Sequence, residues 1–432
     1  MVTEQIALEH AIEHAVGIYI VLVAIACVVG ILTKWLTHLP YTIALVLIGL
    51  VLAIFKIGPE IKETGFSEDL IFFVLLPPLL FQGAFHMQLD RLRRHAIPIG
   101  IFATVGVLAT TLIIGGITRA LNAFDHIMIA MLFGAILCTT DPAAVLAVFR
   151  RHKVAPDLKY LVEGESLFND GTGVVVFGIV LSIIVRQVPF ELGAAAFEFF
   201  KVSLGGAVVG VGLGYGTYLI LRRLNDHLLE NAICLVACYG SFWLAHHFQL
   251  SGVIAVVCVG VLLGNYGRDL AMKPKTTETV ETFFESIAFL INSMLFILIG
   301  LELRAIPAHE MKGNLVPIGI AILAVLIGRL VVVYPLFFAT RRFGGGYPTR
   351  WAHVLFWGGL RGSIPIALLL GLPADSALAG YRANLLVIGF GAVCFTLIVQ
   401  GLTMKPLIEA LKLSARAKEL RADPAHRQEG LV

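Results

Sequence analysis

Long apolar runs, ended by charged residues, proline or glycine, follow one another along almost the whole chain. A bilayer-spanning helix needs about 20 such residues, and the pattern predicts about 13 transmembrane helices in an all-α polytopic membrane protein. They lie at 17–36, 40–57, 67–87, 96–118, 126–149, 157–185, 194–222, 229–247, 250–264, 277–301, 313–340, 350–371 and 382–411. We expect a short extracellular segment at 1–16, a transmembrane domain over 17–411 and a short cytoplasmic tail at 412–432.

The fifth and twelfth of these segments are interrupted by polar and helix-breaking residues. The fifth contains TTDP at 139–142, and the twelfth contains WGGLRGSIP at 357–365. Proline lacks a backbone donor and disfavours helix in the residue before it, so each pattern predicts a broken helix. Non-helical backbone at membrane depth persists only where protein or a water-filled cavity surrounds it. Because the breaks are seven helices apart, we expect inverted repeats whose two broken helices cross at an ion site; no residue-level repeat supports this beyond the breaks.

Composition supports the same class of protein. Hydrophobic residues make up 58% of the 432 residues and charged residues 14%, with a mean hydropathy of +0.89, whereas soluble domains carry roughly 25% charged residues. The net charge of +3 is small and the basic residues fall in separate loops, which argues against nucleic acid as a partner. The chain has no G-x-S-x-G, HExxH or G-x-x-x-x-G-K-[ST] motif. The sequence therefore gives no support for an intramembrane hydrolase or for coupling to ATP. No cofactor is expected.

The distribution of Lys and Arg predicts the orientation. Of the 32 such residues, Arg329 and Arg361 lie within apolar segments. Eight fall in loops on one side of the membrane, namely Lys56, Lys62, Arg119, Arg186, Lys201, Arg304, Lys312 and Arg382. All the others lie on the side of the C-terminus. Cytoplasmic loops carry the excess of basic residues, so we expect the N-terminus outside and the C-terminus in the cytoplasm, in the cell inner (plasma) membrane.

Asp141 stands at the first break, directly before Pro142. One interpretation is that its carboxylate caps the half-helix that starts there. The other is that it binds a cation, because Thr139 and Thr140 add hydroxyls and the break frees backbone carbonyls as further oxygen ligands. The two roles are compatible. A charge at this depth is costly and is by default a functional-site hypothesis.

The sixth predicted helix carries Glu165, Ser166, Asn169 and Asp170 in the run GESLFND. Their spacing places them on neighbouring strips of one helix face. They form either an internal polar network that braces the bundle or an ion site. Burial favours a protonated carboxyl, whereas a nearby cation favours the ionised form. Asp170 can therefore hold a proton or a metal ion but resists holding both, and that competition is the chemistry of an exchanger.

The two arginines within apolar segments need partners. Arg329 lies in LIGRLVVVYP, and Arg361 lies in the second break. A buried guanidinium requires a carboxylate or several carbonyls, and Glu165 is the acid that we pair with Arg329. The alternative is that either arginine extends to the membrane interface.

Four motifs in order, TTDP, GESLFNDGTG, a lone arginine ahead of VYP, and GGLRGSIPIALLL, resemble the monovalent cation:proton antiporter family in its NhaP-type sodium/proton antiporter branch. These are relatives of animal sodium/proton exchangers. The resemblance extends from LLPPLLF in the third segment to about Leu411, and it implies a thirteen-helix homodimer in which a core of crossed, broken helices moves against a dimerisation domain. One position departs from the pattern, because the family commonly has a glutamate after LPPLLF and this chain has Gln82.

The same resemblance implies the cation ligands. Asp170 would be the carboxylate that binds either the ion or the proton. Ser166, Asp141 and the backbone and hydroxyl of Thr140 would complete the Na⁺ site, with Thr139 in the supporting network.

The resemblance also implies a supporting network. Asn169 would brace the broken strand at Thr140, Glu165 would pair with Arg329, and Arg361 would lie near the crossing of the broken helices.

The expected function is secondary active exchange of a monovalent cation, Na⁺ or Li⁺ before K⁺, for protons. In the family, an Asn-Asp pair such as Asn169 and Asp170 goes with electroneutral exchange. A single carboxylate trades one proton for one cation, and a neutral amide carries no second proton. The expected partners are the cation, the proton, membrane lipid and a second copy of the chain. A passive cation channel is the alternative. A channel would require a ring of carbonyls or charges along one pore, whereas the acids here are asymmetric and lie at two broken helices.

Overall fold

The computed structural model describes residues 2–35, 40–56, 70–302, 313–343, 345–373 and 377–413, and all regular structure in these ranges is helical. Nine helices there are long and apolar enough to cross a bilayer. They are α1 (Val2–Trp35), α4 with α5 (Leu89–Ile101 and Val107–Ala120), α8 (Pro156–Arg186), α9 (Leu192–Leu221), α10 (His227–His247), α11 with α12 (Gly252–Leu262 and Arg268–Leu270), α13 (Pro274–Glu302), α15 (Leu315–Thr340), and α18 with α19 (Arg382–Phe395 and Gly401–Ala410).

The remaining helices are shorter. They are α2 (Tyr41–Ile54), α3 (Leu76–Phe85), α6 (Ile127–Ile136), α7 (Ala143–His152), α16 (Arg350–Trp357) and α17 (Ser363–Leu370). A π-helical turn joins the two parts of each compound helix, and another, Leu70–Leu75, precedes α3. The segments predicted from the sequence overlap these helices, but within the described residues nine are long and apolar enough to cross a bilayer, so the count of about 13 transmembrane helices stays a prediction.

Three boundaries differ clearly from the prediction. The ninth segment continues through α12 to Leu270, six residues beyond its predicted end at 264. Helix α1 begins at Val2, so the residues expected to form a separate N-terminal segment continue the first helix. Helix α4 begins at Leu89, seven residues before the predicted start at 96. The stretch from Leu89 carries Asp90 and several arginines, so it is helical without being apolar, and hydrophobicity alone missed it. The predicted tail at 412–432 lies almost wholly outside the described residues.

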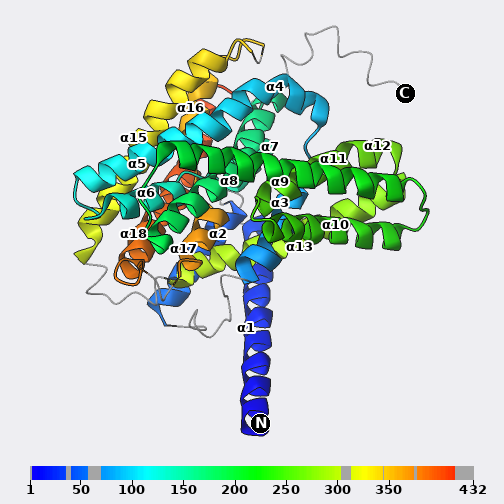
Figure 1. Cartoon of the computed structure of the whole chain (residues 1–432), viewed down its shortest axis with the longest axis horizontal. Coiled ribbons are helices and arrows are strands. Elements are labelled where there is room, and N and C mark those ends of the chain that lie inside the picture. The colour runs from blue at the N-terminus through cyan, green and yellow to red at the C-terminus, as the bar shows by residue number, and fades with distance from the viewer. Residues whose placement is uncertain are drawn as a thin grey trace.

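The helices pack into two groups with α8 between them (Figure 1). In one group α13 packs against α2 and α3, and α11 packs against α3, α9 and α10. In the other, α5 packs against α6 and α15, and α15 packs against α18. Helix α8 contacts α9 and α11 of the first group and α4 and α6 of the second. Its polar side chains therefore lie at the junction of the two groups.

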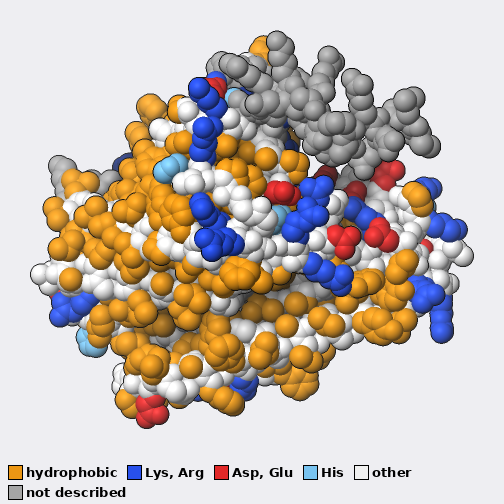
Figure 2. Space-filling model, turned by 90° about the horizontal axis from the view of Figure 1, so that it is seen from above, with side chains coloured by type: hydrophobic (Ala, Val, Ile, Leu, Met, Phe, Trp, Pro, Cys, Tyr) orange, Lys and Arg blue, Asp and Glu red, His pale blue; other side chains and the backbone are white. Residues whose placement is uncertain are grey.

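Much of the outer surface is apolar. Figure 2 shows hydrophobic side chains over most of one face, with Lys, Arg, Asp and Glu side chains gathered mainly toward one part of it. Large apolar side chains on different helices, such as Ile20, Val208, Val236 and Val316, are exposed. A soluble protein rarely presents so much contiguous apolar surface, and this surface suits contact with lipid.

Candidate ion-binding site

The first predicted break is present between α6 and α7. Residues 137–142 are not helical, and the Asp141 carboxylate accepts a hydrogen bond from the backbone N–H of Ala143 in the first turn of α7 (2.8 Å). The backbone N–H of Ser363, which begins α17, also donates to Asp141. Asp141 thus accepts a hydrogen bond at the start of α7, as a cap would, although Pro142 rather than Asp141 occupies the N-cap position, and the same carboxylate contacts both broken helices.

The second predicted break is present between α16 and α17, and it crosses the first. The backbone N–H of Asp141 donates to the carbonyl of Leu360 (2.8 Å), and the backbone N–H of Arg361 donates to Thr396 Oγ1 of the π-helical turn between α18 and α19 (3.1 Å). The approach is so close at Gly362 that an added Cβ would overlap the Asp141 carboxylate. Only glycine fits there.

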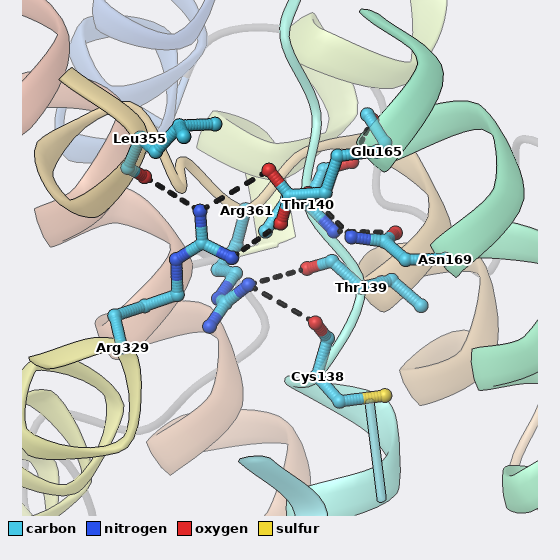
Figure 3. A network of polar contacts seen from close by, with 9 residues as sticks. Cys138, Thr139, Thr140, Glu165, Asn169, Arg329, Leu355 and Arg361 are labelled. Atoms are coloured by element: carbon cyan, nitrogen blue, oxygen red, sulfur yellow. Dashed lines mark hydrogen bonds and ion pairs between the residues drawn. The ribbon is translucent and has the colours of Figure 1, made fainter. Parts of the chain in front are cut away.

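Arg361 binds the carbonyls that the first break leaves unpaired. Its side chain is fully buried, and Nη1 donates to the carbonyls of Cys138 (3.2 Å) and Thr139 (2.8 Å), as Figure 3 shows. These carbonyls lie beyond the C-terminal end of α6, where a positive charge is favourable. The interpretation that Arg361 extends to an interface is therefore wrong.

Glu165 and Arg329 form the predicted ion pair. Arg329 Nη1 lies 2.5 Å from Glu165 Oε1, and Arg329 Nη2 also donates to the carbonyl of Leu355 on α16 (2.6 Å) (Figure 3). Both side chains are almost fully buried. The pair connects α8, α15 and α16, and a buried charge that lost its partner here would be costly.

Asn169 braces the first break, as predicted. Its Nδ2 donates to Thr140 Oγ1 (2.6 Å), and its Oδ1 accepts from the Thr140 backbone N–H (3.2 Å). The Ser166 hydroxyl donates to the Thr140 carbonyl. Side chains of α8 thus form hydrogen bonds with the backbone N–H, the carbonyl and the hydroxyl of Thr140, and these bonds fix the non-helical backbone. The neighbouring Thr139 Oγ1 is buried and has no partner within the described residues.

A cavity of about 180 Å³ lies beside the crossing, between α3, α7, α8, α13 and α17. Asp141, Ser166 and Asp170 line it, together with Ser363. Within the described residues the Asp170 carboxyl accepts no hydrogen bond, although it lies deep in an apolar helix. These four residues bring two carboxylates and two hydroxyls to the cavity, and the Asp170 carboxylate has no hydrogen-bond partner within the described residues.

The polar residues of α8 do not share one face, as the spacing had suggested. Ser166 and Asp170 face the cavity, whereas Glu165 and Asn169 face Arg329 and the broken strand. At about 100° per residue, Glu165 and Asp170 point in directions roughly 140° apart. Of the residues predicted as cation ligands, Thr140 does not line the cavity, because its polar groups are held by α8.

Four polar residues of the cavity were absent from the predicted ligand set. They are Gln82 of α3, Glu163 of α8, Asn292 of α13 and Ser363 of α17. Glu163 precedes Asp170 by seven residues, so helical periodicity alone places it on the same stripe and could have found it. No sequence signal places Asn292 there, because α13 is distant in sequence and its approach depends on packing.

Comparisons with known proteins identify the family. The family model "Sodium/hydrogen exchanger, transmembrane" matches residues 22–410. The Na(+)/H(+) antiporter ApNhaP of Aphanothece halophytica is 36% identical over 414 residues, covering 94% of this chain and 76% of the relative. The Na(+)/H(+) antiporter NhaH of Halobacillus dabanensis is 36% identical over 412 residues, covering 92% of this chain and 98% of the relative.

Among solved structures, the sodium proton antiporter MjNhaP1 from Methanocaldococcus jannaschii has the same fold. Its TM-score is 0.78 at 22% identity, and the match covers 94% of this chain and 100% of that one. The family model and the relatives together span nearly the whole described membrane region. The chain therefore belongs to the sodium/hydrogen exchanger family, as a membrane-embedded secondary transporter rather than an enzyme.

Proposed function

We propose that the protein exchanges a monovalent cation, Na⁺ or Li⁺ before K⁺, for protons by alternating access, and that it serves pH homeostasis. The observation that carries this proposal is Asp170, a carboxyl that faces a cavity without a hydrogen-bond partner in the described chain, beside two crossed, broken helices. Family membership supports it, since relatives at 36% identity are named as Na(+)/H(+) antiporters.

In the proposed cycle, Asp170 loses its proton to one side and binds the cation together with Asp141 and Ser166. Thr140 joins through its carbonyl when the Ser166 hydroxyl turns toward the cation. Hard monovalent cations favour such oxygen ligands. On the other side of the membrane a proton displaces the cation, because the carboxyl holds one or the other.

The proposed stoichiometry is one cation for one proton. Asn169 supports it, because its amide cannot titrate and is occupied by Thr140. Glu165 is paired with Arg329 and is not free to carry a second proton. Exchange is therefore expected to be independent of an imposed membrane potential. A clear potential dependence in liposomes clamped with valinomycin would contradict the one-for-one scheme.

The proposed assembly is a homodimer of chains that each cross the membrane thirteen times as inverted repeats, with the N-terminus outside. The arrangement of helices in two groups about α8 supports a core that moves against a scaffold. The excess of Lys and Arg on the C-terminal side supports the orientation.

The decisive experiment is Asp170→Asn in proteoliposomes that contain a pH-sensitive dye. We expect sodium-dependent dye recovery to fall at least about 100-fold, because an amide neither titrates nor offers a charge to the cation. The melting temperature in detergent should stay near the wild-type value, since Asp170 has no hydrogen bond with any described residue to lose. Exchange that survived the substitution would contradict the assignment, and conductance without exchange in the wild type would indicate a channel.

A further inference from the structure

The cavity holds a second group of oxygen-bearing side chains, apart from Asp141 and Asp170. Gln82 of α3, Glu163 of α8 and Asn292 of α13 line it. They come from three different helices, and α3 packs against both α8 and α13. A carboxylate and two amide carbonyls are ligands of the kind that hard cations take.

Glu163 lies on the same stripe of α8 as Asp170. Seven residues are almost two turns of helix, so the two side chains project to the same side about 10 Å apart along the axis. Glu163 is the nearer of the two to the start of α8 at Pro156, and its side chain is 20% exposed. A cation that entered from that end would meet Glu163 before Asp170.

Among the described residues, Glu163 has no strong ion-pair partner. Lys159, on the same helix, lies 3.9 Å away and is itself 39% exposed, which makes a weak ion pair. The other charged groups that act on Glu163 are His86 of α3 and Arg150 of α7. His86 is already engaged, because its Nε2 lies 3.2 Å from Glu285 Oε1 of α13. The Glu163 carboxylate is therefore not neutralised by a close ion-pair partner and is available to a cation in the cavity.

We propose that Glu163, Gln82 and Asn292 form an outer subsite for the monovalent cation, ahead of the Asp141 and Asp170 pair. The cation stops there, still partly hydrated, before it loses its remaining water at Asp170. The outer subsite sets the apparent affinity for the cation from the Pro156 end of α8, while Asp170 performs the exchange. This inference rests on the proposed function.

The test is the sodium dependence of exchange in proteoliposomes. We expect Glu163→Gln to raise KM for sodium about five- to tenfold, with the maximal rate within about twofold of wild type, since a nearby charge is lost but the exchanging carboxyl is kept. Adding Gln82→Glu to Glu163→Gln returns an acid to the cavity from α3 and is expected to lower KM again. Glu285→Gln is the matched control, because Glu285 belongs to the His86 pair and does not line the cavity.

Sodium binding without transport gives a second readout. In Asp170→Asn, sodium is expected to raise the melting temperature of the detergent-purified protein relative to choline, and adding Glu163→Gln is expected to remove that shift. An unchanged KM in Glu163→Gln, an equal KM rise in Glu285→Gln, or no sodium shift in Asp170→Asn would overturn the outer subsite. A wild type without sodium-proton exchange would instead overturn the proposed function, and the melting shift would still report the subsite.

Discussion

Helix α8 separates two polar regions whose groups are paired to different degrees. On one side, Glu165 pairs with Arg329, and Asn169 makes two hydrogen bonds with Thr140. On the other side, Asp170 faces the cavity and accepts no hydrogen bond within the described ranges. In the first region, which we call the closed side, the acid and the amide are both paired, whereas the carboxyl of the second region, the cavity side, is free to bind an ion.

This difference in pairing shows how the non-helical backbone of a broken helix can be stabilised while the cavity beside it stays free for an ion. Arg361 binds the freed carbonyls, and Asn169 binds Thr140, both on the side of the break away from the cavity. Asp170 is therefore not needed to hold the non-helical backbone. Buried polar groups without partners are costly, so the carboxylate, the amide and the freed carbonyls on the closed side are all paired. Within the described residues, four buried polar atoms there have no hydrogen-bond partner, namely Thr139 Oγ1, Arg329 Nε, and Nε and Nη2 of Arg361. Substitutions on the two sides are therefore expected to have separable effects, on stability for the closed side and on exchange for the cavity side.

The largest expected effect on stability is on the closed side, at Arg329. Arg329→Met leaves the Glu165 carboxylate buried without its partner, which typically costs about 3–5 kcal/mol of folding free energy. We expect a melting temperature in detergent that is many degrees lower and a loss of exchange that follows from unfolding. Thermal unfolding of the purified protein, followed by circular dichroism, measures it.

Two controls separate the lost charge pair from the lost side chain. The double variant Arg329→Met with Glu165→Leu removes both charges and is expected to recover most of the stability. Arg186→Met, at the exposed C-terminal end of α8, is expected to leave melting unchanged. If the double variant were no more stable than the single one, the stabilising role of the pair would be disproved.

A smaller effect, and one confined to exchange, is expected at Asp141. Asp141→Asn keeps an oxygen that accepts from the Ala143 N–H, so the cap on α7 survives. The negative charge toward the cavity is lost, and contacts to charged groups contribute about 1.5–3 kcal/mol. We therefore expect KM for sodium to rise at least about tenfold with little change in melting, as measured in proteoliposomes and by thermal unfolding.

The matched control is Asp226→Asn. Asp226 caps α10 by accepting from the N–H groups of Leu228 and Leu229 and lies outside the cavity. We expect neither KM nor melting to change. A fall in stability for Asp141→Asn that matched its fall in affinity would show that Asp141 is mainly a structural cap, and the two sides of α8 would then be less distinct.

The two helix breaks and the buried ion pair could be predicted from the sequence, because single residues determine each of them. Pro142 and the glycines around Arg361 located both breaks, since proline and glycine act through local backbone geometry. The Glu165 and Arg329 pair could be predicted because a buried arginine must find an acid.

Other features depend on packing and could not be predicted in this way. The division of the α8 residues between two sides depends on α3, which packs against α8, and on Arg329 of α15, which reaches Glu165. Asn292 enters the cavity only because α13 packs against α3. The early starts of α1 and α4 were missed because charged residues can be helical, and an apolar window does not detect them.

The smallest predicted effect concerns Ser166, which belongs to both regions. Its hydroxyl lines the cavity and also donates to the Thr140 carbonyl. Ser166→Ala removes one neutral hydrogen bond, worth about 0.5–1.5 kcal/mol, so we expect KM for sodium to rise about two- to tenfold and melting to fall slightly. Ser182→Ala is the control, because that hydroxyl donates to Ile179 on the same helix away from this cavity. A change in melting alone would assign Ser166 to the closed region, and a change in KM alone would assign it to the ion.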